Sequence, residues 1–366
     1  MKNFIDQFEL IQPSYERFAR KINELIKELL EEQHVKFHGI EYRAKTIESF
    51  NEKVQRKGKS YLNPINDLTD LAGVRIILYY LDDINKLTEI IDSEFDVDEK
   101  NSVDKKSELQ FDQFGYLSIH KVISLKSNRN ELVEWQFCKG FKCEVQIRTV
   151  LQHAWASISH TLQYKEESDV PKEIRRELHR LSGLLELADE EFLKIKQKRL
   201  DLSNNIGESI NNNNLDIRIN LDSLFLFSQT SSIYKRIAEV GYESGYARIT
   251  YGELERQLPK EDIEIAGFNF NISLLIKICE YLEIETLQQL EGELNKAFVE
   301  VGSKFTLLLS RLKESEEEEG SYFATPEFLV TQAVILMYLK TLPKDFLVEA
   351  TQWDEKYISI MLSLNV

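Results

Sequence analysis

Hydrophobic and polar positions follow two different periods along the first 200 residues, and these periods predict the secondary structure. Apolar residues recur every three or four positions over 13–32, which predicts an amphipathic helix. The same spacing predicts helices over about 41–56, 150–162 and about 172–199. The β-branched and aromatic run VRIILYY at 74–80 is typical of a buried strand.

Two further strands and one helix follow from local patterns. Residues 116–125 read as a strand, and 141–149 alternate strictly. Asp82 or Asp83 is expected to cap a helix that runs through Ile91. One face of 141–149 is predicted to lie in the core, and the other is predicted to be functional or wet. The apolar face has Phe141, Cys143, Val145 and Ile147, and the polar face has Lys142, Glu144, Gln146 and Arg148.

The character of the chain changes after residue 203. The segment NNIGESINNNN at 204–214 cannot build a core and is predicted to be a linker. Beyond it, helical periods recur over 230–240, 272–282, 286–313 and 327–341. We therefore predict an N-terminal helix (1–34), an α+β domain (35–203), the linker (204–214) and a mostly α-helical domain (215–366).

Composition excludes several classes of protein. The 366 residues are 42% hydrophobic and 30% charged, and they contain no apolar run of the roughly 18 residues that a membrane span needs. The start of the chain shows no export signal, so a cytoplasmic location is expected. Three cysteines without CxxC spacing favour reduced thiols, and the six histidines form no HExxH motif. The sequence thus indicates neither a zinc ribbon nor a histidine-based metallohydrolase.

Negative charge is concentrated in the second half. Residues 1–200 carry 32 Lys+Arg and 35 Asp+Glu, whereas residues 201–366 carry 14 and 27. This acidity disfavours nonspecific binding of the second half to nucleic acid or anionic membrane. It leaves open a solvated acidic surface or a cover for a basic site on the first half.

Carboxylates and lysines of the first domain are the candidate chemical groups. Asp70 stands at the mouth of the strand 74–80, and Glu144 stands in the middle of the strand 141–149. The predicted helix 41–56 carries Lys45, Ser49 and Lys53 at i, i+4 spacing, and Lys57 continues the series. Because Mg²⁺ binds one or two carboxylates together with phosphate oxygens, this set points to phosphoryl or nucleotidyl transfer.

Four segments of the first 200 residues stand out in order: EYRAKTIESFNEKVQRKG (41–58), DLAGVRII (70–77), FGYLSIH (114–120) and EVQIRTVLQHAWASISHTLQYK (144–165). In their order and spacing they resemble the synthetase domain of the RelA/SpoT family. These enzymes move pyrophosphate from ATP to the 3′ hydroxyl of GDP or GTP, making (p)ppGpp and releasing AMP. The resemblance implies a nucleotidyltransferase-like mixed β-sheet flanked by helices over about residues 35–200, and it says little about 205–366.

The resemblance implies a role for each matching residue on the ATP side. Arg43 and Arg75 would sandwich the adenine, since planar guanidinium groups stack on aromatic faces. Asp70 and Glu144 would bind Mg²⁺, and Glu144 would also activate the 3′ hydroxyl. The residues matching the phosphate-binding positions, or lying close to them, are Lys45, Ser49, Lys53, Arg56 and Lys57.

The acceptor side shows both matches and a departure. Tyr116 matches the aromatic residue that stacks on guanine, and Gly115 allows close backbone approach. Leu117 stands where long family members have Arg or Gln, so one polar contact to the acceptor is missing or comes from elsewhere. The remaining residues assigned to the acceptor side are His120, Gln146, Arg148 and His153.

Three hypotheses remain open from the sequence. The leading one is a Mg²⁺-dependent synthetase of (p)ppGpp. The second is a toxin or phage-defence pyrophosphokinase that modifies the 3′ CCA end of tRNA and is restrained by the acidic C-terminal domain; the domain's lack of excess positive charge counts against it. The third is an inactive nucleotide-binding module. Whether the C-terminal helices regulate the enzyme or form a homo-oligomer also stays open.

Overall fold

The structure is a computed structural model that divides into two compact units, Met1–Gln197 and Lys198–Val366. The boundary lies close to residue 203, the predicted end of the α+β domain. The described residues are 2–56, 61–105, 117–162, 171–249, 268–300, 302–315, 323–351 and 355–365.

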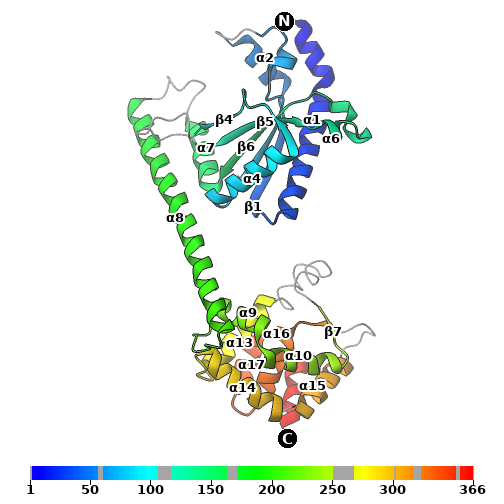
Figure 1. The fold of residues 1–366 in the computed structure, drawn as a ribbon, viewed down its shortest axis with the longest axis vertical. Coiled ribbons are helices and arrows are strands. Elements are labelled where there is room, and N and C mark those ends of the chain that lie inside the picture. The colour runs from blue at the N-terminus through cyan, green and yellow to red at the C-terminus, as the bar shows by residue number, and fades with distance from the viewer. Residues whose placement is uncertain are drawn as a thin grey trace. The chain divides into compact units, whose positions relative to one another are not determined.

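The first unit is a β-sheet with helices around it (Figure 1). Within the described residues, the strands are β1 (Phe37–Ala44), β2 (Ala72–Leu78), β3 (Phe95–Val97), β4 (Val103–Asp104), β5 (Ile119–Leu125) and β6 (Cys143–Thr149). The helices are α1 (Lys2–Glu32), α2 (Ile47–Gln55), α3 (Pro64–Asp67), α4 (Leu81–Glu94), α6 (Ser127–Asn130), the 3₁₀ helix η1 (Val133–Cys138), α7 (Val150–Leu162) and α8 (Lys172–Asn211).

Strand pairing makes this sheet mixed. The order is β1-β2-β6-β5-β3, with β4 paired to β5. Strands β2 and β6 run parallel, and the other pairs are antiparallel. The register sets Arg43 opposite Gly73 and Gly73 opposite Glu144, so these positions share one face of the sheet. The predicted mixed α+β sheet flanked by helices is confirmed.

The opposite face of the sheet builds the core. Cys143, Val145 and Ile147 are fully buried there with apolar residues of α1 and α4, as the alternation predicted. Helix α1 begins at Lys2 rather than near residue 13. Its first turns are held because the ring of Phe8 stacks on that of Phe50 at 4.2 Å between centroids.

The predicted helix over 41–56 is wrong in its first part. Residues 37–44 form strand β1, and α2 begins only at Ile47. Pairing with β2 stabilises this extended conformation over the local helical preference. Thr46 then caps α2 by accepting the Ser49 N–H at 3.2 Å. Lys45 consequently lies between strand and helix, not on a common helical stripe with Ser49 and Lys53.

Other boundaries also differ from prediction, two of them at helices that contact the first unit's sheet or follow it. Helix α4 has Tyr80 as its N-cap, without a side-chain cap, and Asp82 and Asp83 lie in its first turn. Both aspartates instead contact Lys196 Nζ on α8, at 2.9 and 3.3 Å. Helix α8 runs on to Asn211, so residues 204–211 of the predicted linker are helical.

The second unit is mostly helical, as predicted. The pattern over 286–313 corresponds to two helices rather than one. The elements are α9 (Leu221–Thr230), α10 (Ser232–Glu243), β7 (Ala247–Arg248), α13 (Phe268–Tyr281), α14 (Leu287–Glu300), α15 (Gly302–Ser315), β8 (Phe323–Ala324), α16 (Pro326–Met337), α17 (Lys344–Thr351), α18 (Glu355–Leu362) and the 3₁₀ helix η3 (Ser363–Asn365).

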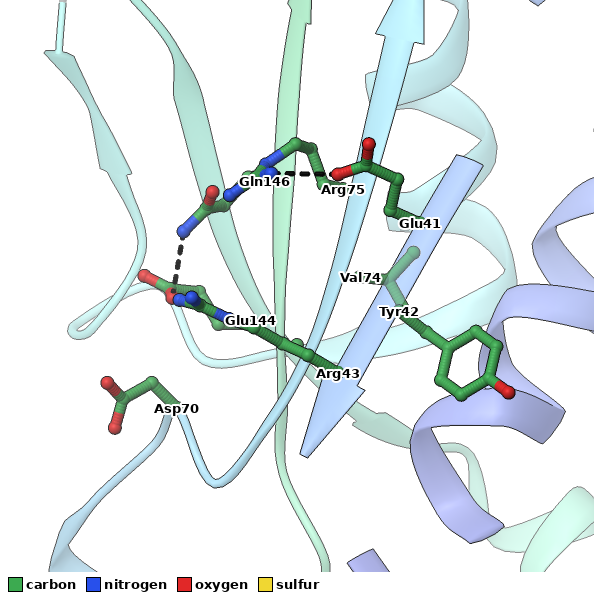
Figure 2. Close-up of a pocket in the computed structure, with 9 residues that line it drawn as sticks. Glu41, Tyr42, Arg43, Asp70, Val74, Arg75, Glu144 and Gln146 are labelled. Atoms are coloured by element: carbon green, nitrogen blue, oxygen red, sulfur yellow. Dashed lines mark hydrogen bonds and ion pairs between the residues drawn. The ribbon is translucent and has the colours of Figure 1, made fainter. Parts of the chain in front are cut away.

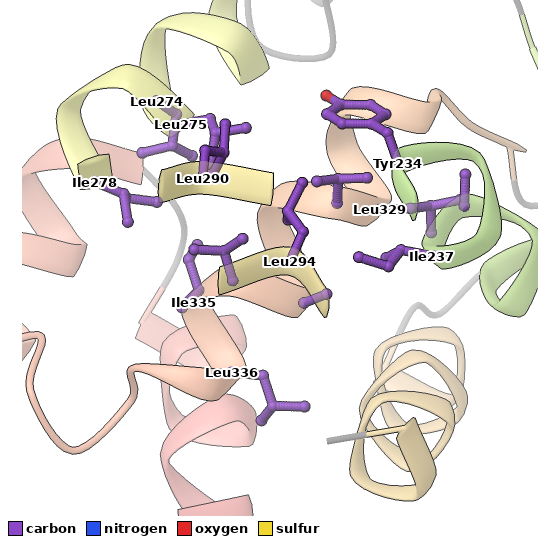
Figure 3. Close-up of a cluster of buried hydrophobic side chains, with 14 of the residues drawn as sticks. Tyr234, Ile237, Leu274, Leu275, Ile278, Leu290, Leu294, Leu329, Ile335 and Leu336 are labelled. Carbon is purple, nitrogen blue, oxygen red and sulfur yellow. The ribbon is translucent and has the colours of Figure 1, made fainter. Parts of the chain in front are cut away.

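Helix α16 forms the centre of this unit. Its residues from Leu329 to Leu336 are all buried, and Figure 3 shows Leu329 beside Tyr234 and Ile237 of α10. A Cβ atom built on Gly241 would lie 2.5 Å from Leu329 Cδ2, so this glycine permits the close packing of α10 on α16. No described helix of the protein is long and apolar enough to cross a membrane.

A buried carboxylate joins α8 to the end of β6. Asp189 is only 3% exposed, and it accepts a hydrogen bond from Thr149 Oγ1 at 2.7 Å. Burial raises the pKa of Asp189 to about 6 despite this hydrogen bond, and the charge of Glu186 adds to the increase.

We expect Asp189 to make folding stability fall as pH rises. The folded protein holds the carboxyl proton of Asp189 more tightly than the unfolded chain does. The stability that this difference contributes is therefore fully present below about pH 4 and is lost as the pH rises through about 6. The rise from 3.8 to about 6 corresponds to a loss of about 3 kcal/mol. Asp189→Asn should remove this loss, and urea unfolding of both proteins at pH 4.5 and 7 measures it. A difference between variant and parent that does not change with pH would contradict the expectation.

Candidate active site

A pocket opens on the face of the first unit's sheet opposite α1 and α4 (Figure 2). Its volume is about 400 Å³ including the open mouth. Strands β1, β2 and β6 and the segment before β2 supply its side chains. The residues that line it are Glu41, Tyr42, Arg43, Asp70, Gly73, Val74, Arg75, Glu144 and Gln146.

Two lysines converge on Asp70. Its Oδ2 atom lies 2.9 Å from Lys45 Nζ and 2.5 Å from Lys53 Nζ. Burial alone would raise the pKa of Asp70, but the hydrogen bonds and charges of the two lysines outweigh it and hold this pKa below its usual value. Asp70 is therefore a carboxylate at neutral pH. The two lysines meet at Asp70 although they do not share one helix.

Glu144 lies on β6 between two polar neighbours. Its Oε1 atom is 3.0 Å from His120 Nδ1, and Gln146 Nε2 donates to its Oε2 at 3.2 Å. Burial would raise the pKa of Glu144, and so would the charge of Asp70. The hydrogen bond and attraction from His120 outweigh both, so the pKa is held below its usual value. Glu144 is thus also ionised at neutral pH.

The two predicted adenine-binding arginines lie on neighbouring strands of this face. The side chain of Arg43 extends above Gly73. A Cβ atom built on Gly73 would lie 3.7 Å from both Cγ and Nε of Arg43. Arg75 Nη1 donates to Glu41 Oε2 at 2.8 Å. Figure 2 shows Arg43 directed toward Glu144, and Arg75 between Glu41 and Gln146.

The donor set fits a divalent cation. Asp70 Oδ1 is buried and has no hydrogen-bond partner in the described part of the chain. Glu144 lines the same pocket and is close enough for its pKa to respond to the charge of Asp70. Among the described residues, no group of three or more His, Cys, Asp or Glu could hold a metal. Two carboxylates that leave positions for phosphate oxygens and water suit Mg²⁺.

The other predicted site residues that the structure describes do not line this pocket. Ser49 accepts a hydrogen bond from Thr46 Oγ1 at the start of α2, and Arg56 is exposed after its end. Arg148 is buried on β6. His153 lies on α7, where burial lowers its pKa and the charge of Arg148 lowers it further. Lys57, Gly115 and Tyr116 lie outside the described residues.

Sequence reasoning missed Glu41. This carboxylate lies two residues before Arg43 on β1, so both side chains share the pocket face. Its pairing with Arg75 fixes the guanidinium that the sequence had assigned to adenine. The period-2 relation of Glu41 and Arg43 was a usable signal, but it was hidden by the helix predicted over 41–56.

Comparisons with known proteins identify relatives of this chain. A family model described as a region found in RelA / SpoT proteins matches residues 42–169. GTP pyrophosphokinase YwaC of Bacillus subtilis (strain 168) is 33% identical over 159 residues, which are 43% of this chain and 72% of that protein. GTP pyrophosphokinase YjbM of the same organism is 27% identical over 169 residues, 45% of this chain and 75% of that protein.

Solved structures also align with part of this chain. The crystal structure of small alarmone synthetase 1 from Bacillus subtilis aligns with 54% of this chain and 99% of its own, with 27% identity and a TM-score of 0.45. Small alarmone synthetase 2 from the same organism aligns with 52% of this chain and 98% of its own, with 27% identity and a TM-score of 0.43.

The chain belongs to the RelA/SpoT synthetase family. Its first unit carries a GTP pyrophosphokinase-like synthetase domain, as the sequence motifs predicted. The family model ends at residue 169, so the helical unit Lys198–Val366 lies outside it.

Proposed function

We propose that the protein transfers pyrophosphate from ATP to the 3′ hydroxyl of GDP or GTP and releases AMP. The observation that carries the proposal is the pocket itself, where ionised Asp70 and Glu144 lie with Arg43 and Arg75 on one sheet face. The 33% identity to a protein named GTP pyrophosphokinase supports the same substrates.

The register of β1 and β2 supports the proposed binding of adenine by Arg43 and Arg75. Arg43 and Arg75 are diagonal neighbours on β1 and β2, because Arg43 faces Gly73 and Glu41 faces Arg75. Diagonal neighbours of a sheet lie about 7–8 Å apart at the backbone, which is within reach of long side chains, so both guanidinium groups can contact one planar base. Lys45 and Lys53 contact Asp70, which lines the pocket, and they would supply positive charge for phosphates bound there.

Asp70 and Glu144 would hold Mg²⁺ between the protein and the phosphates. Asp70 Oδ1 is a buried carboxylate oxygen without a hydrogen-bond partner among the described residues, and such a cation would satisfy it. When bound, Mg²⁺ would neutralise negative charge that develops on the transferred pyrophosphate.

Glu144 is the candidate general base. In the transfer, a bond forms between the acceptor's 3′ oxygen and the β-phosphorus of ATP, and the bond from that phosphorus to the oxygen of the leaving AMP breaks. The 3′ hydroxyl proton goes to the ionised Glu144 carboxylate. His120 and Gln146 orient this carboxylate through their hydrogen bonds, and the acceptor is expected beside them.

The acceptor is tested by incubating the protein with γ-labelled ATP and Mg²⁺ and, in parallel, GDP, GTP, ATP and tRNA. Label in GDP or GTP is the expected result, and the Glu144→Gln variant should give none above background. Label at the tRNA 3′ end alone would replace the proposal with the translation-blocking alternative. Absence of transfer to every acceptor would favour the inactive module.

A further inference from the structure

The hydroxyl of Thr149 connects three elements at one buried point. Thr149 is the last residue of β6 and is fully buried. Its Oγ1 donates to Asp189 of α8 at 2.7 Å and accepts the backbone N–H of Gln152 in α7 at 3.1 Å. Gln152 Oε1 in turn accepts the Thr149 N–H at 3.0 Å, which completes a capping box at the start of α7.

Asp189 determines how this hydroxyl can act. A hydroxyl has one proton, so donation to Asp189 leaves only the lone pairs of Oγ1 to face the Gln152 N–H. Donation to a carboxylate also polarises the hydroxyl and strengthens it as an acceptor. The turn from β6 into α7 is thereby set by a carboxylate that is 40 residues further along the chain.

This turn lies between three of the residues assigned to the acceptor side. Gln146 and Arg148 come just before it on β6, and His153 comes just after it in the first turn of α7. The ATP-side arginines lie on β1 and β2, which do not pass through this turn. A change of the Thr149 rotamer would therefore displace acceptor-side groups more than ATP-side groups.

We infer that Asp189 is a positioning residue for the acceptor half of the synthetase site, acting through the Thr149 hydroxyl. The inference rests on the proposed function, since it concerns the nucleotide that receives pyrophosphate. Asp189 does not line the pocket, so its effect on the reaction would be indirect, through Thr149 and the β6–α7 turn.

Thr149→Val tests the inference because it removes the hydroxyl and nearly preserves the side-chain volume. Loss of a hydrogen bond to a charged group should raise the KM for GDP by about tenfold, while the KM for ATP stays within about twofold. Thr149→Ser keeps the hydroxyl and should restore the parent KM for GDP. Asp189→Asn keeps a neutral acceptor and should raise this KM by about threefold.

Lys196→Met is the matched control. Lys196 of α8 also makes a contact within the first unit, but its partners are Asp82 and Asp83 at the start of α4. If α8 acts only as a structural support, Lys196→Met and Thr149→Val should change both KM values alike, and this result would overturn the inference. If the contact positions the acceptor, Lys196→Met leaves the KM for GDP unchanged.

The outcomes separate the inference from the proposed function. An active parent whose Thr149→Val variant has the parent KM for GDP refutes the inference alone, whereas a parent that labels no guanosine nucleotide refutes the proposed function. Circular dichroism checks folding. If Thr149→Val does not fold, the test passes to Asp189→Asn, which is expected to melt no lower than the parent. A raised KM for GDP in Asp189→Asn supports the inference, and an unchanged KM for GDP refutes it.

Discussion

Replacing Glu144 with glutamine is expected to lower kcat by about 10³-fold. Glutamine keeps the size of the side chain and can accept the hydrogen bond from Gln146, but it cannot take the proton of the 3′ hydroxyl. It also has no charge to bind Mg²⁺. Steady-state transfer from labelled ATP to GDP gives kcat, and circular dichroism confirms folding.

Glu41→Gln is the matched control for this prediction. Glu41 is a second carboxylate of the same pocket, but its partner is Arg75 and its expected role is to orient that guanidinium. Its replacement should raise the KM for ATP and change kcat by less than about tenfold. If Glu144→Gln retained a kcat within about tenfold of the parent, Glu144 would not be the base.

Asp70→Asn is expected to lower kcat by a similar factor of about 10³ and to raise the Mg²⁺ concentration needed for half-maximal activity. The substitution removes the charged carboxylate that carries the partnerless oxygen. It also leaves Lys45 and Lys53 facing a neutral amide, so their mutual repulsion is no longer offset. A Mg²⁺ titration of activity in the variant and the parent measures both effects.

Asp67→Asn is the corresponding control. Asp67 belongs to α3, three residues before Asp70, and its exposed carboxylate accepts the Asn63 N–H at 2.9 Å. The same chemical change at this position should leave both kcat and the Mg²⁺ requirement at parent values. An unchanged Mg²⁺ requirement in Asp70→Asn would remove Asp70 from the metal site and leave it only as the anchor of the two lysines.

In the free protein, the carboxylates of the site are paired with basic side chains. Lys45 and Lys53 neutralise Asp70, and His120 attracts Glu144, so two nearby carboxylates both remain ionised. A polyphosphate with its Mg²⁺ can replace these contacts, because it offers anionic oxygens to the lysines and a cation to the carboxylates. The free pocket therefore already contains the charges that the proposed substrates require.

Local patterns predicted the strands that are buried on one face. Along β6 the apolar positions repeat every second residue, and Cys143, Val145 and Ile147 are indeed buried. Strand β1 was missed because EYRAK also fits a helical period. Its extended form depends on pairing with β2, about 30 residues away.

Contacts between polar side chains were harder to predict than helices and strands. Lys45 was expected on one helical stripe with Ser49 and Lys53, and it lies before that helix instead, yet both lysines reach Asp70. The pair of Glu41 and Arg75 forms only because β1 and β2 are antiparallel in one particular register. The bond from Thr149 to Asp189 spans 40 residues and has no local signal.

By itself, the sequence determined the chemical groups of this protein, the order of its motifs, the family and the division into an α+β unit and a helical unit. These properties depend on residue identity and on short-range periods, which are local. The tertiary structure decided which groups meet: Asp70 with two lysines, Glu144 with His120, and Thr149 with Asp189. Such contacts depend on strand register and helix docking, which are set when distant segments bury their apolar faces together.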